Sequence, residues 1–287
     1  MSRPFEGKTC IVTGATSGLG RACAEQLARE GAALQLICRS PEKAERARGE
    51  IVMATGNDAI DIVIADLSSQ AAIRGAAATL LSTTPRIDLL INNAGVTNLS
   101  REVTLDGIEA TFAVNHLAYF LLTTLLLERI KESPGARVIN IASDAHKFGG
   151  SIDLDDLGLE DGFGWIRAYG RSKGANILFT QELSRRLADS EVVTHAVHPG
   201  FVRSSLGANN GRFGQLVTQI AAVFAMPAER AARYVIALCH EPQFATPSGG
   251  YFYKAKKQSQ AAWTQDEQLA RRLWDRSEAL VAESAAG

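Results

Sequence analysis

Cysteine is scarce in this sequence. The 287 residues contain four cysteines, and none of them forms the C-x-x-C pair that is typical of zinc or redox sites. Cys10 and Cys38 lie in strand-like segments, so we expect buried, reduced thiols rather than disulfides or metal ligands. Unpaired thiols persist in a reducing compartment, and we therefore predict a cytoplasmic protein without a metal site.

The sequence also lacks an excess of charge and a long apolar run. The 30 Lys and Arg residues against 31 Asp and Glu residues give a formal net charge of −1, which supplies no bulk field for nucleic acid or an anionic membrane. No stretch reaches the roughly 18 uninterrupted apolar residues of a membrane-spanning helix. The nearest, LAYFLLTTLLLERI at 117–130, is better explained as a buried helix, and the first residues, MSRPFEGKTCIVTG, resemble no signal peptide. We therefore predict no nucleic-acid partner and no integral membrane segment.

Strand-like and helix-like segments alternate along the chain. Such alternation is typical of a parallel sheet with helices on both faces, and no Pro-, Gly- or Ser-rich linker divides it. We predict a Rossmann-like, doubly wound α/β fold in a single domain, residues 1–287, with a cofactor half at about 1–130 and a catalytic and substrate half at about 131–287. The predicted strands are 9–14, 33–38, 59–66, 86–95, 136–143, 192–200 and 249–254, and the predicted helices are 18–30, 40–55, 69–82, 105–131, 167–188, 228–240 and 265–281.

Glycine and polar residues gather where the predicted strands end. The carboxyl ends of parallel strands share one rim of the sheet, and ligands of open α/β sheets bind there. A random scatter of turn residues would use both rims, so this clustering indicates a nucleotide site. Two long irregular segments, 144–166 and 201–226, also follow strands and are expected to line the substrate pocket. The residues at the strand ends are Gly14 to Gly20, Arg39, Asp66, Asn92 to Gly95, Ser143, Pro199 and Gly200.

The first of these clusters, TGATSGLG at 13–20, joins a strand to a helix. The free N–H groups and partial positive charge of a helix N-terminus suit a pyrophosphate, and glycine lets the backbone turn sharply beside it. The sequence therefore predicts a phosphate-binding loop. A strand-to-helix turn without a ligand is the alternative for this loop taken alone.

Five features together resemble the short-chain dehydrogenase/reductase family: TGATSGLG, NNAG at 92–95, Asn115, Ser143 and YGRSK at 169–173. T-G-x-x-x-G-x-G is that family's form of the loop, and the resemblance covers most of the chain. Within the family the chain is most similar to the retinol dehydrogenase branch. Members of that branch often carry an N-terminal membrane anchor that these residues do not show, so we do not expect a membrane-bound retinoid enzyme. The stretches that carry the likeness are VNHLAYFLLTTLLL, SKGANILFTQELSRRL, VHPG and ARRLWDRS.

The resemblance implies four catalytic residues. Tyr169 would act as general acid and base, and Ser143 would bond the substrate oxygen. Asn115 would hold a water that relays protons to Lys173. The spacing of Tyr169 and Lys173 places both on one helix face, so we expect the ammonium to lower the pKa of the phenol. A surface i,i+4 pair is the alternative for these two residues, and a core-facing or capping asparagine is the alternative for Asn115.

The end of the second predicted strand selects the cofactor. An acidic residue there favours NAD, whereas arginine accommodates the 2′-phosphate of NADP. In LICRS, at 36–40, Arg39 offers a planar fork and Ser40 a hydroxyl, so we predict that NADP(H) is preferred, with NAD(H) as the second choice. A solvated arginine at a helix start is the alternative.

The remaining cofactor contacts follow from the resemblance. Asp66 would bond the adenine amino group, although it could also cap the helix that starts near Ser68. Asn93, Ala94 and Gly95 would form a wall beside the adenine ribose, with a plain turn as the alternative. The full set of predicted cofactor-binding residues is Gly14, Thr16, Ser17, Gly18, Leu19, Gly20, Arg39, Ser40, Asp66, Leu67, Asn93, Ala94, Gly95, Tyr169, Lys173, Pro199, Gly200, Val202 and Ser204.

The sequence therefore predicts an oxidoreductase that interconverts a small-molecule alcohol and a ketone or aldehyde by hydride transfer with NADP(H), on a lipophilic or aromatic substrate. An NAD(H)-dependent enzyme of the same family is the alternative, as is a nucleotide-binding regulator without activity. The complete Ser-Tyr-Lys set argues against a regulator, because such proteins usually lack part of it. Family members are often dimers or tetramers, so we expect a homodimer or homotetramer.

Overall fold

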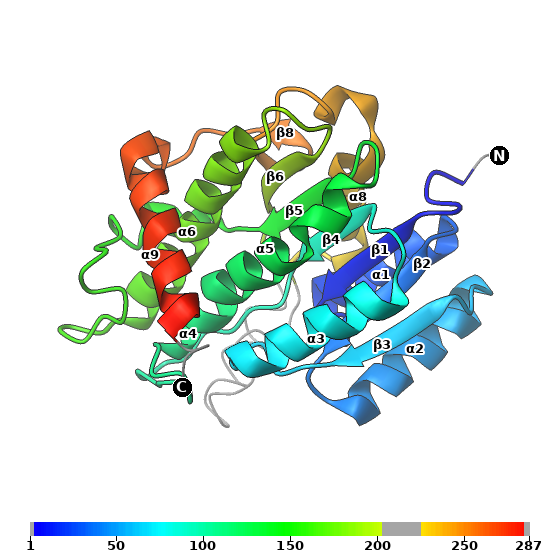
Figure 1. Ribbon diagram of the computed structural model, residues 1–287, viewed down its shortest axis with the longest axis horizontal. Helices are drawn as coiled ribbons and strands as arrows, with labels where there is room; N and C mark the ends of the chain where they lie inside the picture. Colours follow the sequence, from blue (N-terminus) through cyan, green and yellow to red (C-terminus); the bar gives the residue numbers. More distant parts are fainter. Residues whose placement is uncertain (1–2, 203–224, 284–287) are drawn as a thin grey trace.

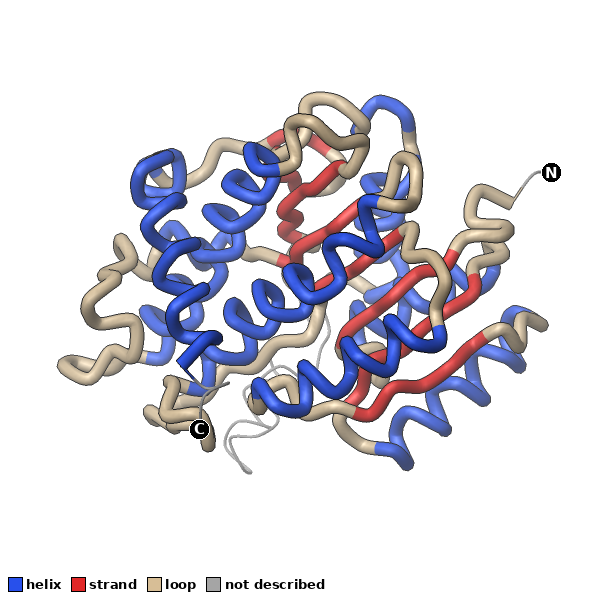
Figure 2. Tube along the Cα trace, viewed as in Figure 1, coloured by secondary structure: helices blue, strands red, loops and turns tan. Residues whose placement is uncertain are grey.

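The strands of the computed structural model, which describes residues 3–202 and 225–283, form one eight-stranded sheet (Figure 1, Figure 2). They are β1 (Thr9–Thr13), β2 (Ala33–Cys38), β3 (Ile60–Ile64), β4 (Leu89–Asn92), β5 (Arg137–Ile141), β6 (Val193–His198), β7 (Gly250–Tyr253) and β8 (Lys256–Lys257). Their order is β3-β2-β1-β4-β5-β6-β7-β8, and every pair is parallel except β7 with β8, a short edge strand that the sequence does not predict. The order reverses between β1 and β4, where a doubly wound sheet leaves a crevice for ligands.

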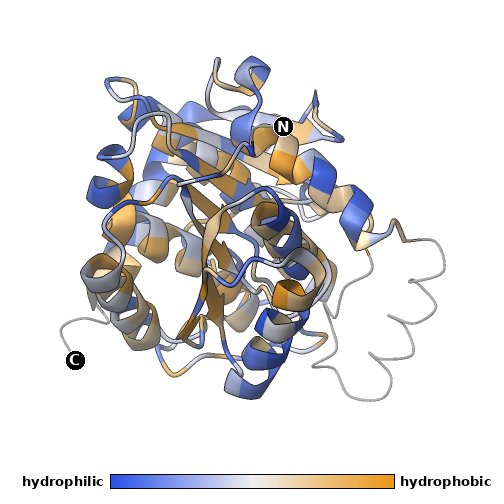
Figure 3. Cartoon of the chain, turned by 90° about the vertical axis from the view of Figure 1, so that its right-hand side faces the viewer, coloured by the Kyte–Doolittle hydropathy of each residue, from blue (hydrophilic) through white to orange (hydrophobic). Residues whose placement is uncertain are grey.

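Helices cover both faces of the sheet. They are α1 (Gly18–Arg29), α2 (Pro41–Thr55), α3 (Gln70–Thr83), α4 (Ala110–Phe112), α5 (Ala118–Lys131), α6 (Trp165–Arg186), α8 (Ala228–His240) and α9 (Glu267–Glu283). One face carries α1, α2 and α8, and the other carries α3, α5 and α6, with α9 packed against α6 (Figure 1). Figure 3 shows the apolar strands between these two layers. The arrangement confirms the predicted single α/β domain.

Local sequence signals set the ends of the first helices. Ser40 precedes α2, its hydroxyl accepts from the N–H of Lys43 at 3.3 Å, and Pro41 takes the first helical position. Gly31 lies just after α1 with φ +93°, a left-handed conformation that glycine adopts most readily. Both helices therefore lie where the sequence predicts them.

Two apolar cores, one on each face of the sheet, hold the layers together. The four cysteines are free and buried in the core on the α1 side. On the other side, the rings of Phe120 and Phe179 lie 4.9 and 5.7 Å from the ring of Trp274, measured between centroids. Since Trp274 belongs to α9, this aromatic cluster fixes α9 to α5 and α6.

The helix predicted over 105–131 begins later, at Ala110. Gly107 has φ +75° and bends the chain before it. The carboxylate of Glu109 then accepts from two backbone N–H groups of the first turn, each at 2.8 Å. This capping acid ends the preceding turn and starts the helix. The apolar spacing predicts the helix but not its start.

The same helix contains an irregular turn. Residues Ala113–Leu117 form a π-helical turn between α4 and α5, a feature that is frequent at functional sites. Among the residues that the structure describes, one helix, Ala110–Lys131, is long and apolar enough to cross a membrane, and 78% of its most apolar 18-residue window is buried inside the protein. A core helix passes the same test, so length and composition are weak evidence for a span.

A row of polar side chains crosses the interior at β4 and β5. Asn92 and Asn140 occupy paired positions, and Nδ2 of Asn92 donates to Oδ1 of Asn140 at 2.9 Å and to Oγ1 of Thr123 at 3.0 Å. Nδ2 of Asn140 donates to Oγ1 of Thr180 at 3.0 Å. All four residues are buried. Leaving one such group unpaired costs about 1–3 kcal/mol, so the row ties both strands to α5 and α6.

Candidate active site

The glycine loop turns tightly between β1 and α1. Gly14 has φ +69°, and a Cβ atom there would lie 2.9 Å from Cα of Ala94. A Cβ atom on Gly20 would lie 2.4 Å from the carbonyl oxygen of Gly14. Both positions therefore require glycine. Because α1 begins at Gly18, the free N–H groups of its first turn open onto the rim of the sheet, as a phosphate loop requires.

The other residues of the loop differ in exposure. Ser17 is exposed and Thr16 is half-buried, so their side chains can reach a ligand at the rim. Leu19 is buried in the core on the α1 side. Its backbone N–H, rather than its side chain, is what it can offer a phosphate.

The segment after β4 is bonded to the glycine loop. The hydroxyl of Thr13 accepts from the N–H groups of Asn93 and Ala94 at 2.8 and 2.9 Å. The side-chain amide of Asn93 donates to the carbonyl oxygen of Thr13 at 2.8 Å. The Asn93 side chain therefore supports the loop, and the wall formed by residues 93–95 presents backbone to the crevice.

The end of β2 places Arg39 on the same rim, directly after the strand and exposed. Ser40 behaves differently from Arg39. Its hydroxyl caps α2 and donates to Oε2 of Glu42 at 2.8 Å. Arg39 is therefore the stronger candidate for a cofactor contact, because Ser40 already has a structural role.

Asp66 follows β3 at the rim. Its Oδ1 atom accepts from the N–H and the hydroxyl of Ser68 at 2.9 and 2.8 Å, which stabilises the turn before α3. The helix cap is Ser69, whose hydroxyl accepts from the N–H of Ala72 at 3.3 Å. The alternative reading of Asp66 as the helix cap is therefore wrong.

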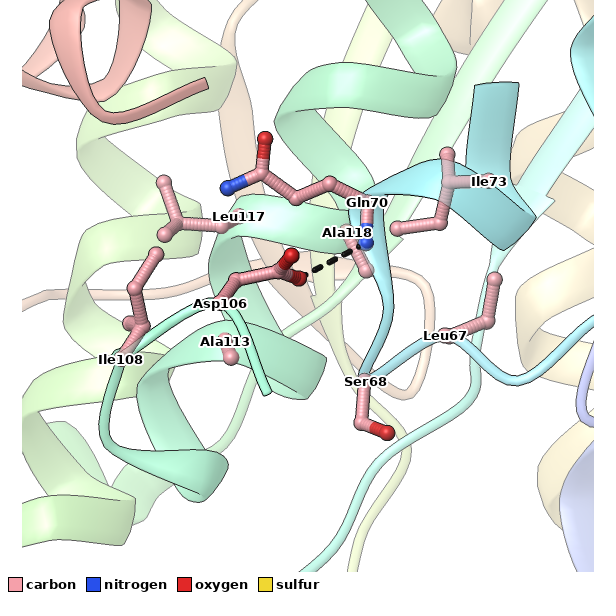
Figure 4. Close-up of a pocket in the computed structure, with 9 residues that line it drawn as sticks. All are labelled: Leu67, Ser68, Gln70, Ile73, Asp106, Ile108, Ala113, Leu117 and Ala118. Atoms are coloured by element: carbon pink, nitrogen blue, oxygen red, sulfur yellow. Dashed lines mark hydrogen bonds between the residues drawn. The ribbon is translucent and has the colours of Figure 1, made fainter. Parts of the chain in front are cut away.

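A small cavity lies behind this turn, between the start of α3 and the segment 106–118 (Figure 4). Leu67 and Leu117 line it from opposite sides. At its edge, Oδ2 of Asp106 accepts from the N–H of Gln70 at 2.8 Å. Its volume of about 10 Å³ suits one water molecule and no cofactor. The cavity belongs to the packing of α3, and the crevice lies outside it.

Three of the four predicted catalytic residues meet near the end of β5. Ser143 lies two residues after that strand, and Tyr169 and Lys173 lie one turn apart on α6. The Ser143 hydroxyl lies near enough to the phenol of Tyr169 to lower its pKa. Nζ of Lys173 lies 5.8 Å from the centroid of the Tyr169 ring. This geometry excludes the alternative of an isolated surface pair.

Burial sets the charges of these groups. Lys173 is buried, Nζ donates to the carbonyl oxygen of Ile141 at 3.0 Å, and burial lowers the pKa of Lys173 to about 7. Tyr169 keeps part of its surface exposed, yet burial raises its pKa to about 12, and the nearby Ser143 hydroxyl offsets only part of this rise. The expected lowering of the pKa of Tyr169 is therefore wrong for the protein alone. Desolvation of the phenolate outweighs an ammonium that is only partly charged at neutral pH.

Asn115 lies in the π-helical turn and faces the core. Its Oδ1 atom accepts from the N–H of Val96 at 2.8 Å. Its Nδ2 atom donates to the carbonyl oxygen of Val96 and to the hydroxyl of Ser172, each at 3.0 Å. The side chain thus adopts the core-facing role that the sequence leaves open as an alternative, and it ties Val96, directly after the wall at 93–95, to α6.

Two buried polar residues beside the site were not predicted from the sequence. Tyr119 lies one turn after Asn115, and its ring centroid is 5.3 Å from Nζ of Lys173. Asn176 lies one turn after Lys173, and its Nδ2 atom donates to the carbonyl oxygen of Ile141 at 3.2 Å. Helical spacing could have found both, since residues three or four apart share a face.

Asp144 and His146 hold the turn after Ser143. His146 is buried, with Nδ1 at 2.6 Å from the carbonyl oxygen of Ser143 and Nε2 accepting from the N–H of Ala261 at 3.1 Å. The carboxylate of Asp144 accepts from the hydroxyl of Tyr251 at 2.8 Å. Both side chains are engaged with the protein at the start of the segment 144–166.

The segment after β6 reaches the rim as predicted. Pro199 is buried, and Gly200 has φ +95° beside the ring of Tyr253. Val202 pairs with Met226 in a parallel bridge. Ser204, another predicted contact, lies outside the described residues.

The groups along the crevice fit a nicotinamide dinucleotide. The N-terminus of α1 suits the pyrophosphate, the exposed Arg39 guanidinium suits a phosphate on the adenosine ribose, and hydroxyls and an ammonium stand at the reacting end. Across residues 3–202 and 225–283, the His, Cys, Asp and Glu side chains form no group that could hold a metal ion.

The doubly wound sheet, its glycine loop and the Ser-Tyr-Lys cluster define a dinucleotide-dependent dehydrogenase. A sequence profile described as short chain dehydrogenase matches residues 8–213, and the chain belongs to this family of oxidoreductases acting on alcohols and carbonyls. Human retinol dehydrogenase 13 is similar, with 42% identity over 281 residues that cover 96% of this chain and 85% of the relative.

Solved structures agree with this assignment. A crystal structure of an uncharacterized protein from Mycobacterium Paratuberculosis has a TM-score of 0.79 at 30% identity and covers 97% of this chain and 94% of its own. A short chain dehydrogenase from Burkholderia cenocepacia J2315 in complex with NADP has a TM-score of 0.67 at 25% identity and covers 87% and 97%.

Proposed function

We propose that the protein interconverts a lipophilic or aromatic alcohol and the corresponding ketone or aldehyde with NADP(H). The observation that carries this proposal is the meeting of Ser143, Tyr169 and Lys173 at the end of β5, on the rim that the glycine loop also reaches. A general acid, a hydroxyl for the substrate oxygen and an ammonium are the groups that carbonyl reduction by hydride transfer needs.

Exposed apolar side chains support a lipophilic substrate. Phe148 follows Ser143 and is 76% exposed, and Phe201 follows β6 and is 62% exposed. Trp165 and Ile166, at the start of α6, are 45% and 48% exposed. These side chains come from the segments around the reacting groups, and large apolar groups left in water there suit an apolar ligand. The likeness to retinol dehydrogenase 13 is in keeping with this choice.

Arg39 supports NADP(H) over NAD(H). It is exposed at the end of β2, and no carboxylate stands at that position to accept from a ribose 2′-hydroxyl. A guanidinium can bind a phosphate through two parallel N–H groups. The NADP complex of the Burkholderia cenocepacia dehydrogenase supports the same choice by similarity.

Ser143, Tyr169 and Lys173 each have a separate role in the proposed reaction. A bound nicotinamide supplies the hydride for reduction and accepts it in oxidation. The Ser143 hydroxyl donates to the carbonyl oxygen of the substrate, and Tyr169 gives that oxygen its proton. The raised pKa of Tyr169 keeps this proton on the phenol at neutral pH, which favours its role as an acid. Lys173, fixed on the Ile141 carbonyl, stabilises the phenolate that results.

The test is a panel of retinal, steroid ketones, aryl ketones and medium-chain aldehydes with NADPH and with NADH. We expect oxidation of NADPH with at least one carbonyl, and a higher kcat/KM for NADPH than for NADH. Tyr169→Phe should lower turnover by about 10²–10⁴-fold and leave NADPH binding nearly unchanged. Tyr234→Phe on α8 removes a hydroxyl elsewhere and should keep full activity.

Two results would contradict the proposal. Turnover that survives Tyr169→Phe would show that another group transfers the proton. A clear preference for NADH would contradict the choice of cofactor while leaving the reaction class intact.

A further inference from the structure

A line of buried polar side chains runs from α6 to α9 beside Lys173. Asn176, His116 and Ser277 form this line, and each has no more than 1% of its surface exposed. Burial of polar groups is unfavourable unless each is hydrogen-bonded, so the partners of these three residues show what the line holds in place.

Asn176 binds two backbone positions of the active site at once. Its Nδ2 atom donates to the carbonyl oxygen of Asn115 at 2.8 Å and to that of Ile141 at 3.2 Å. The Ile141 carbonyl also accepts from Nζ of Lys173 at 3.0 Å. One amide therefore fixes the acceptor of the lysine relative to the π-helical turn that carries Asn115.

His116 orients this amide. Because Nδ2 of Asn176 faces two carbonyl oxygens, its Oδ1 atom is the one directed at Nδ1 of His116, 3.3 Å away. An amide oxygen only accepts, so Nδ1 carries a proton. Burial lowers the pKa of His116 to about 4, which leaves the ring neutral and Nε2 as an acceptor.

Ser277 closes the line from α9. Its hydroxyl lies 3.1 Å from Nε2 of His116 and 2.7 Å from the carbonyl oxygen of Leu273, so one proton has two acceptors. The position of Ser277 is fixed by Trp274, one turn earlier, which stacks on Phe179 of α6. The guanidinium of Arg186 covers the same indole at 4.2 Å from the ring centroid.

We propose that Asn176 is a positioning residue for the Tyr169–Lys173 pair, oriented by His116 and by Ser277, so that α9 forms part of the frame of the active site. The inference rests on the proposed function of that pair. Without the Asn176 amide, the Ile141 carbonyl and the π-helical turn lose their common donor. The Lys173 side chain is then held less rigidly beside the Tyr169 phenol, and it stabilises the phenolate less well.

The test uses the full chain and the carbonyl that gives the highest turnover. Asn176→Leu should lower kcat by about 10–100-fold, as expected for misplaced reacting groups, with KM for the carbonyl changed by less than about threefold. The rise of alcohol oxidation with pH should shift to higher pH, because the phenolate is less stabilised. Ser277→Ala should act in the same direction by about threefold, the effect of one hydrogen bond, and Ser277→Thr should restore the wild-type values.

Thr123→Val is the matched control. It removes a buried hydroxyl that accepts from Nδ2 of Asn92 and takes no part in the hydrogen bonds of the Asn176, His116 and Ser277 side chains. We expect it to lower the free energy of unfolding as Asn176→Leu does, without a change in kcat or in the pH profile. If Asn176→Leu and Thr123→Val had the same effect on both, Asn176 would be a structural residue only and the proposal would be wrong.

A second readout needs no turnover. The ¹⁵N shifts of the His116 imidazole, assigned by their loss in His116→Gln, should show a neutral ring with the proton on Nδ1 from pH 5 to 8. In Asn176→Leu that proton should move to Nε2, with Ser277 as its acceptor. A wild-type ring protonated on Nε2 would overturn the proposed line even in an active enzyme. An inactive wild type would instead contradict the proposed function.

Discussion

The hydroxyl of Tyr119 donates to the carbonyl oxygen of Ala94 at 2.8 Å. This bond joins α5 to the wall beside the proposed ribose site, and the ring of Tyr119 also lies next to the Lys173 ammonium. A single buried side chain therefore contacts the cofactor half and the catalytic half of the molecule.

Tyr119→Phe removes this bond and keeps the ring. We expect the free energy of unfolding to fall by about 1–2 kcal/mol, because the Ala94 carbonyl loses a buried donor. We also expect weaker NADPH binding, because the wall is less firmly held. Urea unfolding and NADPH fluorescence titration measure the two effects, with Tyr234→Phe as the control. Unchanged stability would show that the bond contributes nothing.

Lys173→Met should stabilise the protein most at low pH. Burial lowers the pKa of Lys173 to about 7 from the ordinary 10.5. Below pH 7 both the folded and the unfolded chain carry the proton, and the folded chain bears the full cost of the buried charge. Between these two values the unfolded chain binds more protons, so the stability of the wild type rises with pH.

The free energy of unfolding of the variant should therefore exceed that of the wild type by on the order of 5 kcal/mol at pH 6, and this excess should shrink toward pH 10. Urea unfolding at pH 6, 8 and 10 measures it. Lys256→Met, at an exposed position of β8, should show no such trend. If the difference in the free energy of unfolding grew with pH, Lys173 could not be a buried ammonium with a lowered pKa.

The two directions of the reaction should respond differently to pH. Burial raises the pKa of Tyr169 to about 12, so the phenol remains protonated across the neutral range. Carbonyl reduction needs this proton, so its kcat/KM should fall no further once the Lys173 ammonium, whose pKa burial lowers to about 7, has lost its charge. Alcohol oxidation needs the phenolate, and its kcat/KM should rise by about tenfold per pH unit. A fall of reduction that continues at about tenfold per pH unit above pH 8 would show that another group donates the proton.

Arg39→Asp should shift the cofactor preference toward NADH. The substitution removes the cation for the 2′-phosphate and introduces an acceptor for the 2′-hydroxyl. We expect the ratio of kcat/KM for NADPH to that for NADH to fall by about 10²-fold, as for the loss of a charge-assisted pair of bonds. Arg46→Asp makes the same charge change at an exposed position of α2 and should leave the ratio near the wild-type value. If both variants lowered the ratio equally, the preference would come from the overall charge of this surface and not from a contact between Arg39 and the 2′-phosphate.

The fold and the placement of most of the candidate site residues could be predicted from the sequence, because they depend on local sequence patterns. The alternation of segments predicts the sheet, and the glycine spacing with Tyr169 and Lys173 predicts the rim. The late helix start at Ala110 could not be predicted, because it depends on a carboxylate, Glu109, that could equally have been solvated.

Contacts between distant parts of the chain, and the effects of burial on pKa values, could not be predicted from the sequence either. His116 meets Ser277 across 161 positions of sequence, and no local pattern pairs them. The pKa of Tyr169 moves against expectation because the desolvation of its ring is a property of the packed site.

The paired amides of Asn92 and Asn140 have a consequence for strand alignment. Side chains of neighbouring residues in a strand point to opposite faces of the sheet, so a slip of β4 against β5 by one residue would move one amide away from the other. Each would then face apolar neighbours without its partner, at a cost of about 1–3 kcal/mol per group. The pair therefore selects a single register for the two central strands. Because Asn93 follows β4 and Ser143 follows β5, this register also fixes the positions of these two residues relative to each other at the rim.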